Sequence, residues 1–151
     1  MTEISLQATD KAIREYHASL ADLRARGVTN EMGVRDAFQT LLKSVAQRKK
    51  WALISEQVVA GVGHTARPDG TLYDANNFPR GHWEAKDTRD DLDLEIDKKR
   101  ARKYPFDNIV FEDTRRAVLF QNNQRVDDYD LTQAAQVARL LETFLNYAAP
   151  Q

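Results

Sequence analysis

The sequence predicts a single α/β domain in which a central mixed β-sheet is flanked by helices. Its length of 151 residues suits one domain. Hydrophobic residues make up 42% of the chain and charged residues 30%, a composition that supplies a core and excludes a disordered chain. The hydrophobic pattern alternates between helical periodicity and short β-branched or aromatic runs, in the order α-α-β-β-β-α-β-β-α. Helices and strands mixed in this order are typical of a sheet covered by helices.

Two helices are expected first. Apolar residues at helical spacing predict a helix over residues 9–26 and a second over 31–47. Thr9 is the expected N-cap of the first helix, and Thr29 or Asn30 that of the second, because their side chains can accept a hydrogen bond from a free backbone N–H.

A change to β-branched and aromatic residues predicts strands in the middle of the chain. Residues 51–60 are expected to form one strand. Residues 68–87 are expected to form a hairpin that opens with a Pro-Asp-Gly turn signal. Its two strands would cover 71–73 and 82–86, joined by a loop over 75–81.

The second half of the chain predicts two helices around two strands. A charged helix with a thin apolar stripe is expected over 90–104, followed by strands over 108–112 and 117–121. The last helix is expected to begin at about residue 130, where Asp130 and Gln133 make a plausible capping pair. No linker or repeat divides the chain, so residues 1–151 are treated as one domain.

Composition excludes several classes of protein. Cysteine is absent, which removes disulfides, thiol catalysis and thiolate metal sites. No run approaches the roughly 20 apolar residues of a membrane-spanning helix. The first ten residues have neither a basic start nor an apolar stretch, so we expect no secretory signal and a cytoplasmic location.

Charge is balanced overall but clustered locally. The 22 basic and 23 acidic residues give a net charge of −1. One basic cluster follows the helix predicted over 31–47, and the other lies in the helix predicted over 90–104, directly after an acidic run. Each cluster has two interpretations: contact with nucleic-acid phosphates, or a solvated face. The candidate DNA-binding residues are Arg48, Lys49, Lys50, Lys98, Lys99, Arg102 and Lys103.

The sharpest chemical feature is the pair Glu84 and Lys86 on a predicted strand. Side chains two residues apart on a strand share a face, so this carboxylate and this ammonium point to the same side. With the loop midpoint near residue 78, Asp69 should lie opposite about residue 87, close to the pair. Asp74 should lie opposite about residue 82, so the hairpin favours Asp69 as the second carboxylate.

Two carboxylates beside a lysine suit Mg²⁺ or Mn²⁺ and phosphodiester hydrolysis. Mg²⁺ prefers oxygen ligands and commonly binds one or two carboxylates and several waters. Asp69 and Glu84 are the candidate ligands, with the Ala85 carbonyl as a third. Glu31 lies on the inward stripe of its predicted helix and could assist the metal or its water.

Each of these residues also has a purely structural interpretation. A cross-strand ion pair explains Glu84 and Lys86. Asp69 before a glycine is ordinary turn chemistry, and Glu31 in the first turn of a helix is favourable to the helix dipole. What distinguishes the set is its order: an inward helical acid, an aspartate, and a Glu-x-Lys on the following strand.

This order resembles the PD-(D/E)xK nuclease superfamily, with Pro68-Asp69 followed by Glu84-Ala85-Lys86. The stretches GVTNEMGVRDAFQTLL, RPDGTL, GHWEAKD and RKYPFDNIVFED resemble the N-terminal nuclease domain of restriction-modification polypeptides that also carry an adenine-N6 methyltransferase. The resemblance covers about residues 28–147 and implies a restriction-endonuclease-like core.

The resemblance also implies a function and a set of roles. It implies a Mg²⁺-dependent DNA endonuclease domain, the cleavage module of a restriction-modification system that works with methyltransferase and specificity regions. Asp69 and Glu84 would bind the metal, Lys86 would serve catalysis, and Glu31 would assist. One alternative keeps the fold without the reaction, as a catalytically inactive nucleic-acid-binding or assembly module. Another is an unrelated α/β interaction domain in which Glu84 and Lys86 form a surface ion pair.

Overall fold

The computed structural model describes residues 3–28, 31–63 and 65–150, with no side chain described at positions 31 and 32. Its elements follow in chain order. They are α1 (Lys11–Ala25), α2 (Glu31–Ala46), the 3₁₀-helix η1 (Gln47–Lys49), β1 (Ala52–Ser55), β2 (Val59–Ala60), β3 (Thr65–Ala66), β4 (Gly70–Tyr73), β5 (Pro79–Ala85), α3 (Leu92–Ala101), β6 (Asn108–Glu112), β7 (Arg116–Gln121), β8 (Gln124–Asp130) and α4 (Ala134–Leu145).

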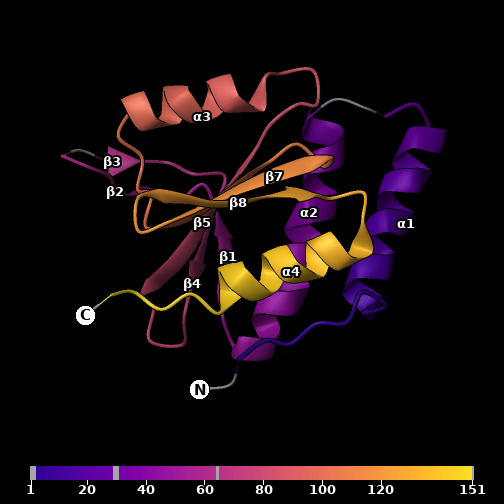
Figure 1. Ribbon diagram of the computed structural model, residues 1–151, viewed down its shortest axis with the longest axis horizontal. Coiled ribbons are helices and arrows are strands. Elements are labelled where there is room, and N and C mark those ends of the chain that lie inside the picture. The colour runs from indigo at the N-terminus through magenta and orange to yellow at the C-terminus, as the bar shows by residue number, and fades with distance from the viewer. Residues whose placement is uncertain (1–2, 29–30, 64, 151) are drawn as a thin grey trace.

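A six-stranded sheet in the order β1-β4-β5-β6-β7-β8 forms the centre (Figure 1). Strands β5 and β6 run parallel, and their neighbours in the sheet pair antiparallel. A parallel pair needs a crossover connection, and α3 supplies it between β5 and β6. Strands β2 and β3 form a separate two-stranded ribbon. The predicted mixed sheet flanked by helices is confirmed.

The helices cover the two faces of the sheet unequally. On one face, α1, α2 and α4 bury a large core that includes Phe38, Trp83 and Leu141. On the other face, α3 lies alone across the sheet (Figure 1) and buries Leu92 and Ile96 in a smaller cluster of phenylalanines. Successive residues of β5 and β6 therefore alternate between the two cores, as the period of a strand requires.

The N-terminal helix differs from the expectation at its cap. Asp10, not Thr9, is the N-cap of α1, because its carboxylate accepts the N–H of Ala12 at 3.0 Å. Gly27 follows the helix with φ of 75°, a conformation that glycine adopts without strain. Thr29 and Asn30, the expected caps of α2, lie outside the described residues.

The register of the β4–β5 hairpin was predicted wrongly. Gly70 pairs with Trp83 rather than with a residue near 86, so Asp69 lies beside Glu84 and not opposite residue 87. The reason is a tighter turn than the sequence suggested. The Asp74 carboxylate accepts the N–H groups of two following residues and ends the loop at Phe78, so β5 begins at Pro79. Asp74 also pairs with Arg80 and stays away from Glu84.

Two further segments differ from the expected strands. The strand predicted over 51–60 is split into β1 and β2, since Glu56 has φ of 52° and interrupts the extended backbone. Strand β8 was missed entirely, because most of its residues are exposed and Tyr129 is its buried residue. The signal for it was the Asn122-Asn123 turn, both residues with positive φ, which suits a tight hairpin.

The last helix begins later than expected. Helix α4 starts at Ala134, and Asp130 does not cap it, because its carboxylate instead accepts the N–H and hydroxyl of Thr132. Helix α3 is shorter than the predicted 90–104 and is capped by Asp91.

Among the described residues, no helix is both long enough and apolar enough to span a membrane.

Substitution of Gly70 by alanine should destabilise the fold, because the added Cβ would lie 2.8 Å from both Leu53 Cδ1 and Trp83 Cε3. Overpacking of a filled core costs about 1–3 kcal/mol, and urea unfolding of Gly70→Ala should measure a loss of that size. An unchanged unfolding midpoint would show that the hairpin is less tightly packed than the structure has it.

Candidate active site

Asp69 and Glu84 lie side by side, and each carboxylate accepts a backbone N–H from the facing segment of the hairpin. The N–H of Asp69 donates to Glu84 Oε1 at 3.0 Å, and the N–H of Ala85 donates to Asp69 Oδ2 at 2.8 Å. Asp69 ends the segment before β4, and Glu84 is the penultimate residue of β5, so the hairpin itself brings the two carboxylates together. The predicted choice of Asp69 over Asp74 agrees with this geometry.

Burial and the neighbouring carboxylate perturb Glu84. The Glu84 side chain is 3% exposed. Burial, and then the charge of Asp69, raise the pKa of Glu84 to about 7, while Lys99 and Lys86 act against that rise. A carboxylate with such a perturbed pKa beside a second acid is typical of a functional site.

Two lysines from different elements approach the same oxygen of Glu84. Lys86 Nζ lies 3.8 Å from Glu84 Oε2, and Lys99 Nζ of α3 lies 3.6 Å from it. Lys86 also contacts Glu95 Oε1 at 3.5 Å. The predicted shared face of Glu84 and Lys86 agrees with these contacts, and that face is the one covered by α3.

Arg35 of α2 reaches the site from the opposite face of the sheet. Its Nη2 lies 3.0 Å from Asp69 Oδ1, and its guanidinium lies 5.7 Å from the centre of the Trp83 ring. The sequence reasoning missed Arg35. Its signal was its position one helical turn after Glu31, since residues four apart share a helix face.

Glu31 is the first residue of α2, the helix that carries Arg35. Its side chain lies outside the described part of the structure, so its predicted assisting role stays a prediction.

Glu112 is a second buried acid that the sequence reasoning missed. It pairs with Ala85 across the β5–β6 ladder, and its carbonyl accepts the N–H of Lys86 at 2.8 Å. Its carboxylate accepts Trp83 Nε1–H at 2.9 Å and the N–H of Thr114 at 2.8 Å. Burial raises the pKa of Glu112 to about 8, even though both hydrogen bonds oppose that rise. Glu112 therefore holds strand β5 in place through its bonds to Trp83 and to the N–H of Lys86.

The two predicted basic clusters occupy different surroundings. Arg48 pairs with Asp10 at 2.9 Å, and Lys49 donates to the Leu145 carbonyl at 2.6 Å, so these two cations already have protein partners. They follow α2 at the end opposite Arg35, about 20 Å away by the rise of a helix. Of the α3 cluster, Lys98 is largely exposed and Lys99 points into the site.

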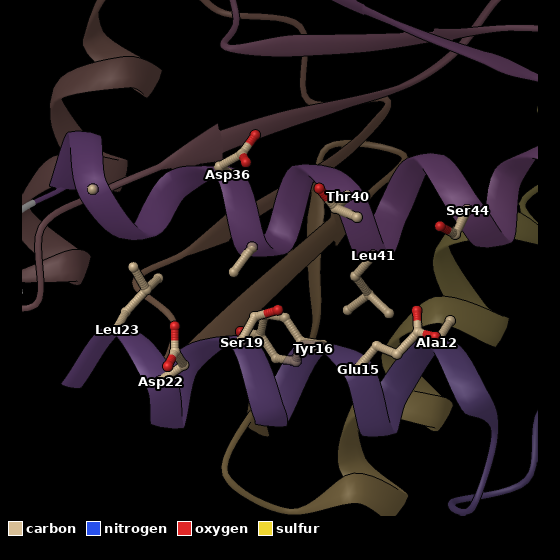
Figure 2. Close-up of a pocket in the computed structure, with 12 residues that line it drawn as sticks. Ala12, Glu15, Tyr16, Ser19, Asp22, Leu23, Asp36, Thr40, Leu41 and Ser44 are labelled. Carbon is tan, nitrogen blue, oxygen red and sulfur yellow. The ribbon is translucent and has the colours of Figure 1, made fainter. Parts of the chain in front are cut away.

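A separate groove lies between α1 and α2. It has a volume of about 300 Å³, and Figure 2 shows Glu15, Asp22 and Asp36 among the side chains that line it. None of the predicted site residues belongs to this lining. The groove is therefore separate from the carboxylates of the hairpin.

The oxygen atoms that the hairpin offers fit an ion such as Mg²⁺ better than a metal that needs three or more side-chain ligands. Asp69 and Glu84 offer carboxylate oxygens next to the Ala85 backbone. No cluster of three or more acidic or histidine side chains able to hold a metal occurs within the described residues. Mg²⁺ commonly takes one or two carboxylates and completes its shell with water and substrate oxygens. Asp69, Glu84 and the Ala85 carbonyl could hold such an ion.

Comparison with solved structures places the fold. A chain of the DrdV–DNA complex, solved by cryo-EM, aligns with 93% of this chain at 42% sequence identity and a TM-score of 0.87. The present chain spans 14% of that longer chain. A crystal structure of a candidate nuclease of DUF820 from Anabaena variabilis aligns over 96% of this chain and 86% of its own, at 10% identity and a TM-score of 0.43. No protein-family model and no curated protein sequence matches the chain. The fold is restriction-endonuclease-like, as the sequence predicted.

Glu112 should make stability depend on pH. Its pKa rises from an ordinary 4.5 to about 8 on folding, so the folded state retains a proton that the unfolded state has lost. The contribution of Glu112 to stability is then highest below pH 4.5 and falls as pH rises towards 8. Between pH 5 and 8, wild type should lose up to a few kcal/mol more unfolding free energy than Glu112→Gln, which cannot ionise. Parallel pH profiles of the two proteins in urea unfolding would contradict this assignment.

Proposed function

We propose that the chain is a metal-dependent DNA endonuclease domain that hydrolyses phosphodiester bonds. The observation that carries this proposal is the convergence of Asp69 and Lys86, both partly buried, on the buried Glu84 at the end of the β4–β5 hairpin. A scattered, exposed arrangement would have favoured a surface ion pair instead. The similarity to part of a protein solved in complex with DNA supports a DNA substrate.

The proposed chemistry divides among the chain's own residues. A Mg²⁺ or Mn²⁺ ion held by Asp69, Glu84 and the Ala85 carbonyl would polarise the phosphate and lower the pKa of a bound water. The ammonium of Lys86 lies beside Glu84 and can hold that water or stabilise the negative charge that develops on the phosphate. Arg35 holds Asp69 at 3.0 Å and so fixes one of the two carboxylates.

The proposal extends to the setting of the domain. We infer that it is the cleavage module of a restriction-modification system, acting in the cytoplasm with methyltransferase and specificity regions of the same or a partner polypeptide. The low coverage of the DrdV chain is consistent with a module that elsewhere occurs within a longer protein. Three exposed cations would contact DNA phosphates near the site: Lys98 of α3, and Arg102 and Lys103, which directly follow that helix. Lys50 would extend the contact.

Removal of both carboxylates should abolish metal binding. Asp69→Ala/Glu84→Ala should show no calorimetric signal with Mn²⁺ under conditions in which wild type binds it, because two of the three proposed ligands are gone. Asp22→Ala is the control, since Asp22 is an exposed acid of α1 that pairs with Arg26. Unchanged Mn²⁺ affinity in the double variant would contradict the metal assignment.

Removal of Lys86 should abolish cleavage while the fold and metal binding persist. Lys86→Ala should reduce single-turnover plasmid cleavage by about 10²–10³-fold, the usual loss for one electrostatic contact to the transition state. Its melting temperature should stay close to wild type. It should still bind Mn²⁺, and no more weakly than wild type, because the substitution removes a cation beside Glu84. A structural ion pair predicts the reverse, slight destabilisation with unchanged cleavage, and wild-type cleavage by Lys86→Ala would remove the nuclease assignment from this site.

A further inference from the structure

Lys99 differs from the other cations of α3 in its burial and partners. Its side chain is 12% exposed, whereas that of its neighbour Lys98 is 65% exposed. Lys99 Nζ lies 3.6 Å from Glu84 Oε2 and donates a hydrogen bond to the Tyr104 hydroxyl at 3.3 Å. It also lies 4.6 Å from the centre of the Tyr104 ring. An ammonium held this closely is part of the site rather than of the solvated face.

The contacts of Lys99 connect both carboxylate-bearing segments. Through Glu84 it reaches β5. Through Tyr104, whose hydroxyl donates to the Arg67 carbonyl at 3.2 Å, it reaches the segment that leads into Asp69. Lys99 is therefore held against Glu84, and Tyr104 links it to the segment that precedes Asp69.

Cations already offset the carboxylates of the site without a metal. The described carboxylates of Asp69, Glu84 and Glu95 face four cations at distances of 2.9–3.8 Å, namely Arg35, Lys86, Lys98 and Lys99. A divalent ion added to this set would leave an excess of positive charge. The anionic oxygens of a DNA phosphate would offset that excess, so metal and phosphate should bind together.

We propose that Lys99 is a second lysine of the catalytic site, neutralising Glu84 in the free protein and binding a non-bridging oxygen of the DNA phosphate once a divalent cation occupies Glu84. This rests on the proposed endonuclease function. It assigns Lys99 a contact with the phosphate at which cleavage occurs. The exposed cations Lys98, Arg102 and Lys103 would instead contact neighbouring phosphates of the DNA. It also makes metal affinity depend on the substrate.

The proposal predicts opposite effects of one substitution on two measurements. Lys99→Gln removes a positive charge beside a metal ligand, so Mn²⁺ binding without DNA should tighten, by roughly tenfold. The same variant should cleave plasmid DNA about 10²-fold more slowly in single turnover, because a phosphate contact is lost. Lys99→Arg keeps the charge and should recover most of both properties.

Calorimetry with Mn²⁺, with and without a short duplex, and single-turnover cleavage test this in the full chain. Lys11→Gln is the matched control, since Lys11 is an exposed helical lysine of α1 paired with Glu15, and it should match wild type in both assays. In wild type, the duplex should tighten Mn²⁺ binding.

Two results for Lys99→Gln would overturn the role of Lys99 and indicate a structural ion pair. One is cleavage at the wild-type rate, and the other is a loss of metal affinity together with a lower melting temperature. A wild-type chain that neither binds Mn²⁺ nor cleaves would overturn the proposed function itself, and the role of Lys99 with it. The role of Lys99 is therefore tested by the variant, and the proposed function is tested by the wild-type protein.

Discussion

The reciprocal hydrogen bonds between Asp69 and strand β5 are the constraint on which the site depends. Glu84 accepts the N–H of Asp69 at 3.0 Å, and Asp69 accepts the N–H of Ala85, the residue after Glu84, at 2.8 Å. Two carboxylates in a buried place repel each other and lose hydration, and that arrangement persists only when hydrogen bonds and cations compensate. The remaining contacts of the site, from Arg35, Lys86 and Lys99, supply that compensation.

The parallel pairing of β5 and β6 explains where the cations come from. A parallel pair cannot be joined by a tight turn, so the chain crosses over one face as α3. The crossover returns Glu95 and Lys99 to the residues that ended β5. A hairpin at this point would have left Glu84 facing solvent, and its carboxylate would then have kept an ordinary environment.

A series of side-chain contacts on the large-core face of the sheet supports the position of Asp69. Glu112 accepts the indole N–H of Trp83, Arg35 lies over the same indole, and Arg35 in turn holds Asp69. Because Trp83 is fully buried and packed against Phe38, this chain joins the large core to the candidate ligands. The orientation of Asp69 therefore depends on the packing of the large core around Trp83.

The sequence by itself determined the class of fold, the position of most helices and strands, and the shared face of Glu84 and Lys86, because hydrophobic periodicity and strand alternation are local properties of the chain. It did not determine the hairpin register, which depends on the hydrogen bonds of Asp74, or strand β8, whose exposed residues carry no apolar alternation. The sequence does not distinguish three further residues of the site from ordinary charged surface residues: Arg35, Lys99 and Glu112. Only the tertiary structure brought them to the site, because helix crossing and strand pairing set contacts between residues 15 to 34 positions apart.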